Sequence, residues 1–110
     1  MASELQIYID QGATYSQQMT INDDSGNPVD LTTASLISQI RRSYTSTTFY
    51  SFNINAVDLV NGIISLNLSS AQTQALSSGR YVYDAFYTIG NKTIKIIKGT
   101  LTVYPSVSKV

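Results

Sequence analysis

Apolar and polar residues alternate with a period of two along most of the chain, and turn-forming residues interrupt the alternation about every eight to twelve positions. Because successive side chains of a strand point to opposite faces, this pattern predicts β-strands that each bury one face. Seven segments show it: residues 4–9, 14–21, 34–42, 49–54, 63–68, 81–88 and 94–103. In the last segment the apolar residues change from one face of the strand to the other near Gly99, which predicts a β-bulge or a crossing between sheets.

Two dipeptides predict tight hairpin turns. Asn61-Gly62 favours a type I′ turn after the arm 57–60, because both residues accept positive φ. Gly90-Asn91 predicts a second hairpin before the last strand. Residues 22–28 combine nearly every turn-forming residue type, so we expect a loop at the surface there.

One short helix is predicted after residue 68. Ser69 and Gln72 have the spacing of a capping box, in which each side chain bonds to the backbone N–H of the other residue. One or two helical turns should follow, and Gly79 is free to adopt the left-handed conformation that ends such a segment. A helix this short must lie over the open end of a core. Its apolar face would consist of Ala71, Ala75 and Leu76.

The segment 81–88 is apolar on both faces, which predicts a central strand. Tyr81 stands at its start, two residues before the position where antibody domains carry their second cysteine. It is therefore a candidate for the tyrosine corner of such domains, and equally a candidate for one more core-facing aromatic. Tyr83 would fill the place of that cysteine, facing apolar residues of earlier strands: Met19 or Ile21, and Ile40.

These elements favour an all-β fold, an antiparallel immunoglobulin-like β-sandwich of about seven strands with one short helical turn before the sixth strand. A β-barrel of similar strand number is the main alternative. A chain of 110 residues is long enough for one hydrophobic core, so we expect a single domain over residues 1–110. Residues 1–4 and 106–110 would form short terminal arms.

The composition excludes most kinds of catalytic and metal-binding site. The chain has no His and no Cys, so zinc sites, disulfides and thiol or imidazole nucleophiles are excluded. Its seven acidic residues lie mostly at strand ends or in turns, which leaves no pair for acid/base catalysis. Asp84 is the one in mid-strand, where it either faces solvent or pairs with Arg41 or Lys95. We therefore expect no enzymatic activity and no cofactor.

The net charge of zero argues against nucleic acid and anionic membranes as partners. The apolar runs are far shorter than the roughly 20 residues that a membrane helix needs, and the first residues have no basic start or apolar run of a secretory signal. Four oxygen-bearing residues in and after the loop 22–28 could hold calcium, but they lack the spacing of a known calcium loop and fit a plain turn better: Asp23, Asp24, Asn27 and Asp30.

The residues around the connection between the third and fourth strands are the candidate interaction surface. Tyr44 and Phe49 are aromatic residues that could stack on a sugar ring or dock on a protein, and Arg41 and Arg42 lie beside them in the sequence. Without any Trp, a sugar is the weaker of these two possibilities. The competing interpretation is that Tyr44 and Phe49 are isolated surface aromatics, while their neighbours Tyr50 and Phe52 belong to the core.

Several short motifs resemble one protein family. They are Gly26–Thr32, Gln39–Arg41, Ser70–Thr73, Gly79–Asp84 and Lys98–Val103. Together they resemble the immunoglobulin-like N-terminal domain of tailed-bacteriophage baseplate upper proteins, and the small stand-alone virion proteins similar to it. The resemblance extends from about residue 12 to residue 107. The baseplate proteins continue into fibrous or receptor-binding regions, whereas this sequence stops at Val110. The resemblance therefore indicates no single location on the particle.

The resemblance implies a non-enzymatic structural component of the virion, made in the cytoplasm of a host bacterium. Its partners would be other phage virion proteins, at the tail or baseplate, at the neck or on a fibre. A capsid decoration protein and, less favoured, a carbohydrate-binding adhesion module are the alternatives. We also expect a homo-oligomer or a multi-copy assembly, with the first or the last strand as an exposed edge that pairs with a neighbour.

Overall fold

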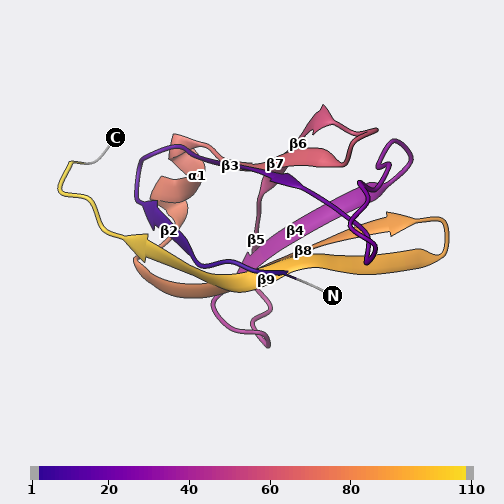
Figure 1. Cartoon of the computed structure of the whole chain (residues 1–110). Coiled ribbons are helices and arrows are strands. Elements are labelled where there is room, and N and C mark those ends of the chain that lie inside the picture. The colour runs from indigo at the N-terminus through magenta and orange to yellow at the C-terminus, as the bar shows by residue number, and fades with distance from the viewer. Residues whose placement is uncertain (1–2, 109–110) are drawn as a thin grey trace.

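The structure is a computed structural model that describes residues 3–108. Two sheets stack as a sandwich, and one short helix lies at one end of it (Figure 1). This is the all-β sandwich that the alternating sequence predicts. The elements in chain order are β1 (Ser3–Glu4), β2 (Ile7–Asp10), β3 (Tyr15–Thr20), β4 (Ser35–Arg41), β5 (Tyr50–Ser51), β6 (Asn53–Asp58), β7 (Ile63–Leu68), α1 (Ser70–Ala75), β8 (Gly79–Ile89) and β9 (Lys92–Tyr104).

The larger sheet has six strands in the order β1-β9-β8-β4-β5, with β2 also paired to β9, and the smaller sheet has the order β3-β7-β6. All strand pairs are antiparallel except those of β1 and β2, which run parallel to β9. β8 lies between β4 and β9, so the prediction of a central strand is confirmed. The prediction that residues 1–4 form an arm is wrong for Ser3–Glu4, which pair with Ile97 and Lys98. Residues 1, 2, 109 and 110 lie outside the described part of the chain.

The expected strand 49–54 is in fact the point where the chain changes sheets. Tyr50 and Ser51 pair with β4 in the larger sheet, and the backbone N–H of Phe52 donates to Ser38 O at 3.2 Å. From Asn53 onward the chain pairs with β7 in the smaller sheet. A continuous alternation of apolar side chains runs through this crossing, so the sequence pattern gives no sign of it.

Three local predictions need correction. The register shift in the β8–β9 hairpin falls at Ile96, between the pairs Ala85–Ile97 and Phe86–Lys95, and not near Gly99. The turn at Asn61 and Gly62 is a four-residue loop in which only Gly62 has positive φ, so it is not type I′. The helix ends with Leu76 in an extended conformation, and Gly79 instead begins β8.

The capping box of α1 is confirmed. The Ser69 hydroxyl accepts from the Gln72 backbone N–H at 3.2 Å, and the Gln72 side chain accepts from the Ser69 N–H at 2.8 Å. The residues expected on its apolar face behave differently, because Ala71 and Ala75 are exposed and only Leu76 is buried. Thr73 takes their place: its buried hydroxyl lies 2.9 Å from Ala13 O and accepts from the Gly12 N–H. The helix is therefore attached to the 11–13 corner by hydrogen bonds.

Two tyrosines on the inner face of β8 define the core. The Tyr81 hydroxyl donates to Ser77 O, four residues upstream, at 2.8 Å, which is the hydrogen bond of a tyrosine corner. The Tyr83 hydroxyl donates to Leu5 O at 2.8 Å, and its ring packs edge-on against Phe52 at a centroid distance of 5.9 Å. Ile40 lies opposite Tyr83 in the ladder, as predicted, while Ile21 belongs to a second buried cluster around Tyr87.

Gly99 allows the backbone at Leu5, between β1 and β2, to come close to Tyr83. A Cβ atom at Gly99 would lie 2.0 Å from Leu5 O, so the two backbones can approach only because position 99 has no side chain. The same carbonyl accepts the Tyr83 hydroxyl. The requirement for glycine here is close packing of backbone, and not the bulge that the sequence suggests.

Candidate docking face

The outer face of the larger sheet carries a cluster of apolar residues that the core does not need. Ile37 pairs with Phe86 directly across β4 and β8, and Val82 pairs with Arg41. Around them lies a shallow depression of about 230 Å³. We define the docking face as Ile37, Arg41, Tyr44, Phe49, Val82 and Phe86. Ile37 is 50% exposed and Tyr44 is 78% exposed, so this face offers apolar surface to a partner.

Arg41 holds the edge of the docking face in a fixed geometry. Its guanidinium carbon lies 4.8 Å from the centre of the Phe49 ring. One nitrogen donates to Gln39 Oε1 at 2.9 Å and another donates to Ser46 O in the loop 43–48. Arg41 therefore joins Phe49 to the loop that carries Tyr44.

Arg42 lies on the opposite side of the sheet and is not part of the docking face. Its guanidinium stacks 4.4 Å from the centre of the Tyr81 ring and donates to Arg80 O at 3.1 Å and to Ser78 O at 3.0 Å. Burial raises the pKa of the Tyr81 hydroxyl, and the charge of Arg42 opposes this rise. Arg42 thus supports the tyrosine corner and the start of β8.

An ion pair borders the docking face on the side of β9. Lys95 Nζ lies 3.9 Å from an Asp84 oxygen and 5.3 Å from the centre of the Phe86 ring. Of the alternatives that the sequence left for Asp84, pairing with Lys95 is the one observed. A partner would thus find an apolar centre with Arg41 at one side and the Asp84–Lys95 pair at the other, which is the usual layout of a protein interface.

The four aromatic residues of the predicted surface separate into two groups. Phe52 is buried, whereas Tyr50, also expected in the core, is 37% exposed and packs edge-on against Tyr81, 6.4 Å between ring centres. Tyr44 and Phe49 are exposed; Tyr44 lines the depression together with Arg41, and the Arg41 guanidinium lies over the Phe49 ring. Three members of the docking face were not predicted from the sequence: Ile37, Val82 and Phe86. Their signal was present, because each is apolar and lies out of phase with the core-facing residues of its strand.

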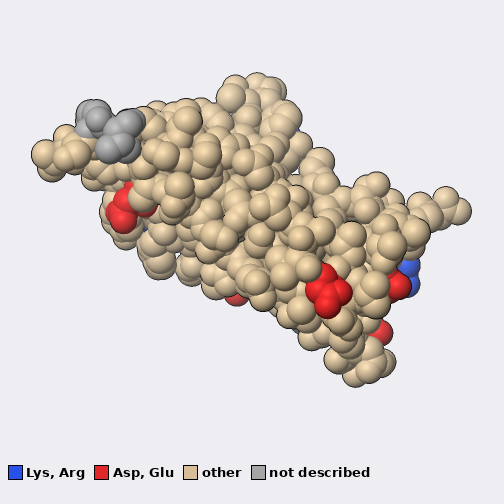
Figure 2. Space-filling model, turned by 90° about the horizontal axis from the view of Figure 1, so that it is seen from above, with Lys and Arg blue, Asp and Glu red and all other residues tan. Residues whose placement is uncertain are grey.

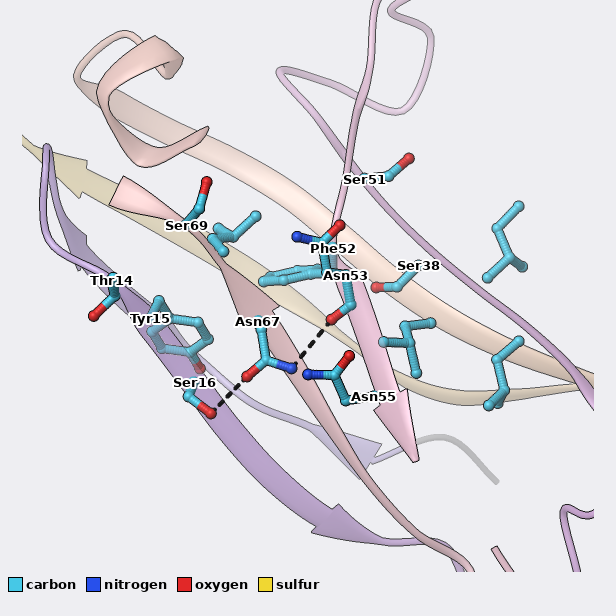
Figure 3. A pocket seen from close by; sticks show the side chains of 14 residues that line it. Thr14, Tyr15, Ser16, Ser38, Ser51, Phe52, Asn53, Asn55, Asn67 and Ser69 are labelled. Carbon is cyan, nitrogen blue, oxygen red and sulfur yellow. Dashed lines mark hydrogen bonds between the residues drawn. The ribbon is translucent and has the colours of Figure 1, made fainter. Parts of the chain in front are cut away.

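A second hollow runs between the two sheets where the chain crosses from β5 to β6 (Figure 3). This open groove has a volume of about 910 Å³, and none of the charged residues within 3–108 lines it. Asn67 lines this groove in a fixed position, because its Oδ1 accepts from the Ser16 hydroxyl at 2.7 Å and its Nδ2 donates to Asn53 O at 3.3 Å. Seen from above, the middle of the surface is largely uncharged, and acidic residues lie mainly toward its ends (Figure 2). Such a groove suits a neutral polar ligand.

The acidic loop uses its carboxylates to hold a turn. Asp23 Oδ1 accepts from the backbone N–H groups of Ser25 at 2.9 Å and Asn27 at 3.0 Å. Asp30 Oδ1 accepts from the N–H and the hydroxyl of Thr32, and these bonds lower the pKa of Asp30. Within residues 3–108, no three acidic side chains gather as ligands of a metal would. The carboxylates of Asp23 and Asp30 thus act as hydrogen-bond acceptors within the loop.

Within the same range, no helix has the length and apolar character needed to span a bilayer.

Comparison with known proteins gives the fold. No family model and no curated protein sequence matches the chain. Among solved structures, the chain is similar to the N-terminal domain of phage TP901-1 ORF48, with a TM-score of 0.52 and 13% identity over 91% of this chain and 93% of that one.

Two further similarities are to parts of larger proteins. The chain matches Listeria monocytogenes InlP at 16% identity with a TM-score of 0.48, and it spans only 26% of that protein. It matches a family 123 glycoside hydrolase from Clostridium perfringens at 12% identity with a TM-score of 0.44, over 23% of the hydrolase.

Proposed function

We propose that this protein is a non-enzymatic structural component of a tailed-bacteriophage virion, which attaches to another virion protein through the docking face. The observation that supports this proposal best is the similarity to the phage TP901-1 ORF48 domain. That similarity covers nearly the full length of both chains, so the two are domains of the same size and architecture. The framework motifs of the sequence point to the same family of modules.

The docking face supplies the chemistry that such an attachment needs. Protein interfaces place apolar and aromatic anchors at the centre and polar residues at the rim. Here Ile37 and Phe86 form the centre, and the cation over Phe49 fixes one side of it. Arg41 and Phe49 are already ordered by their mutual contact, which reduces the conformational entropy that binding would remove.

The location on the particle is the first point to test. Heads and tails of the purified phage would be separated and analysed by quantitative mass spectrometry. We expect the protein in the tail fraction, at the baseplate, the neck or a fibre mount. Its presence only in heads would support the alternative of a capsid decoration protein, and its absence from both fractions would overturn the proposal.

The neutral groove favours a second candidate, a carbohydrate-binding adhesion module. Its lining combines hydroxyl and amide groups with the rings of Tyr15 and Phe52 and carries no charge, which is the chemistry that neutral sugars contact. A glycan array would test it, with Asn67→Ala and Tyr15→Ala as groove variants. Binding that only Tyr44→Ala or Phe49→Ala removes would place the sugar on the docking face instead, and an empty array would remove this candidate.

A further inference from the structure

The edges of the two sheets are protected to different degrees. Exposed edges are usually kept from pairing by shortness, charges or bulges. Among the described strands, β5 has two residues, β1 and β2 are interrupted and carry Glu4 and Asp10, and β6 has a register shift before Asp58. β3 has six residues in unbroken register with β7, and it contains no charge and no proline. Of the edge strands within residues 3–108, β3 alone has none of these protections.

The backbone groups of β3 show which of its residues are available. The N–H of Ile21, just after β3 and in its register, donates to Gly62 O at 2.8 Å. Backbone groups of a strand alternate between its two sides, so the odd-numbered residues of β3 bond to β7. The even-numbered residues then direct their N–H and C=O groups to the free edge: Ser16, Gln18 and Thr20.

The backbone carbonyl of Gln18 already accepts a hydrogen bond from a side chain of β3. The Gln17 Nε2 group donates to Gln18 O at 3.0 Å, and both residues are exposed. A donor therefore reaches this carbonyl from the solvent side. The N–H of a neighbouring strand would replace that amide.

A hollow of about 400 Å³ lies beside the same edge. It borders Thr20 and Ile21, and Ile94 and Ile96 of β9 lie in its wall, only partly buried, beside four charged residues: Asp23, Asp24, Lys92 and Lys95. A strand added beside β3 would lie next to this hollow and its two partly buried isoleucines.

We propose that two copies of this protein pair through β3, antiparallel and about a two-fold axis, with Gln18 opposite Gln18 of the second copy. Opposed residues of an antiparallel pair lie on the same face, and only the even-numbered residues offer backbone groups. The register centred on Gln18 satisfies both conditions and also places Ser16 opposite Thr20. An uncharged strand in a chain of zero net charge meets its own copy without repulsion, which favours a second copy as the occupant.

The absence of cysteine in the chain makes a direct test simple. In Gln18→Cys each molecule has one thiol, and the proposed pair brings the two Cα atoms to about 5.5 Å, within disulfide range. Under mild oxidation we expect rapid formation of a disulfide-linked dimer. Asn55→Cys is the matched control, since it is an exposed position on the β6 edge and should link only slowly.

A charge exchange tests the register without oxidation. Gln18→Lys and Gln18→Glu each place like charges on the two-fold axis, so each alone should weaken the dimer about tenfold or more at low salt. An equimolar mixture of the two should recover the dimer as a heterodimer. Sedimentation velocity would measure the masses, and circular dichroism would show that both variants are folded.

Three results would overturn this inference. They are a monomer at all concentrations up to millimolar, equal linking rates for Gln18→Cys and Asn55→Cys, or no recovery in the mixture of charged variants. The inference is independent of the docking face. A protein that is monomeric but present in virions would contradict the β3 pair alone, and a β3 dimer absent from virions would contradict the proposed function alone.

Discussion

On the inner face of the larger sheet, Tyr81 and Tyr83 are buried, and each hydroxyl donates to a backbone carbonyl of another segment. On the outer side of the same sheet, Tyr44 and Phe49 are exposed, and the Arg41 guanidinium lies over the Phe49 ring. The same residue types thus act in two ways. Inside, Tyr81 links β8 to the segment that follows α1, and Tyr83 links β8 to Leu5 near the start of the chain. Outside, an aromatic residue offers surface to a partner.

Arg41 and Arg42 show how closely the two faces can lie in sequence. They are adjacent, yet Arg41 lies over Phe49 on the outer face and Arg42 lies over Tyr81 on the other side. Strand alternation alone separates them. The role of a residue in this sheet therefore depends on which face its position in the strand presents, and not on its residue type alone.

The largest contrast between the two faces should come from removing one tyrosine from each. Tyr81→Ala removes a buried ring and the corner hydrogen bond, so we expect the free energy of unfolding to fall by about 3–5 kcal/mol. Tyr44→Ala removes an exposed ring and should change it by about 0.5 kcal/mol or less. Urea denaturation followed by circular dichroism measures both, and equal losses would contradict the assignment of faces.

The contact between Gly99 and Leu5 should give the next largest effect. In Gly99→Ala the new Cβ would collide with Leu5 O, so the first strand must move away from β9. We expect a loss of about 1–3 kcal/mol from this overpacking. Amide hydrogen exchange should show faster exchange in residues 3–10, while the β4–β8 ladder keeps its protection. Unchanged exchange in residues 3–10 would show that this close approach is unimportant.

Tyr83→Phe isolates one hydrogen bond of the inner face. The loss of the bond to Leu5 O should cost about 1 kcal/mol at neutral pH. Burial raises the pKa of Tyr83 far above its usual range. The folded state therefore keeps its proton when the unfolded state loses its own, so stability is complete below about pH 10 and falls as the pH rises above it. Tyr83→Phe should decline less steeply in this alkaline range. An identical decline would contradict the burial of the hydroxyl.

The fold was predictable from sequence because alternation, turn residues and the capping box all agree on it. The sheet change at Phe52 was not, since a strand that crosses between sheets keeps the same alternation on both sides. The docking face was only half predicted. Arg41, Tyr44 and Phe49 stand out by type and proximity, whereas Ile37 and Phe86 come together only through the β4–β8 register, which depends on long-range pairing.

The smallest effect should come from the ion pair at the rim of the docking face. Lys95→Ala removes a partly exposed ion pair with Asp84, which should cost between 0 and about 1 kcal/mol and less at high salt. Thermal unfolding at low and high ionic strength would measure it. A large loss that is independent of salt would show that Lys95 supports the fold and is more than a border of the face.

Incorporation into virions tests the central claim most directly. Ile37→Asp and Val57→Asp place the same charge at β-branched strand residues of matched exposure, 50% and 51%, the first on the docking face and the second on the β6 edge strand. Each variant would replace the natural chain in the phage, and copies per particle would be counted by mass spectrometry. The account predicts loss of Ile37→Asp from particles and normal incorporation of Val57→Asp. Normal incorporation of Ile37→Asp would contradict it.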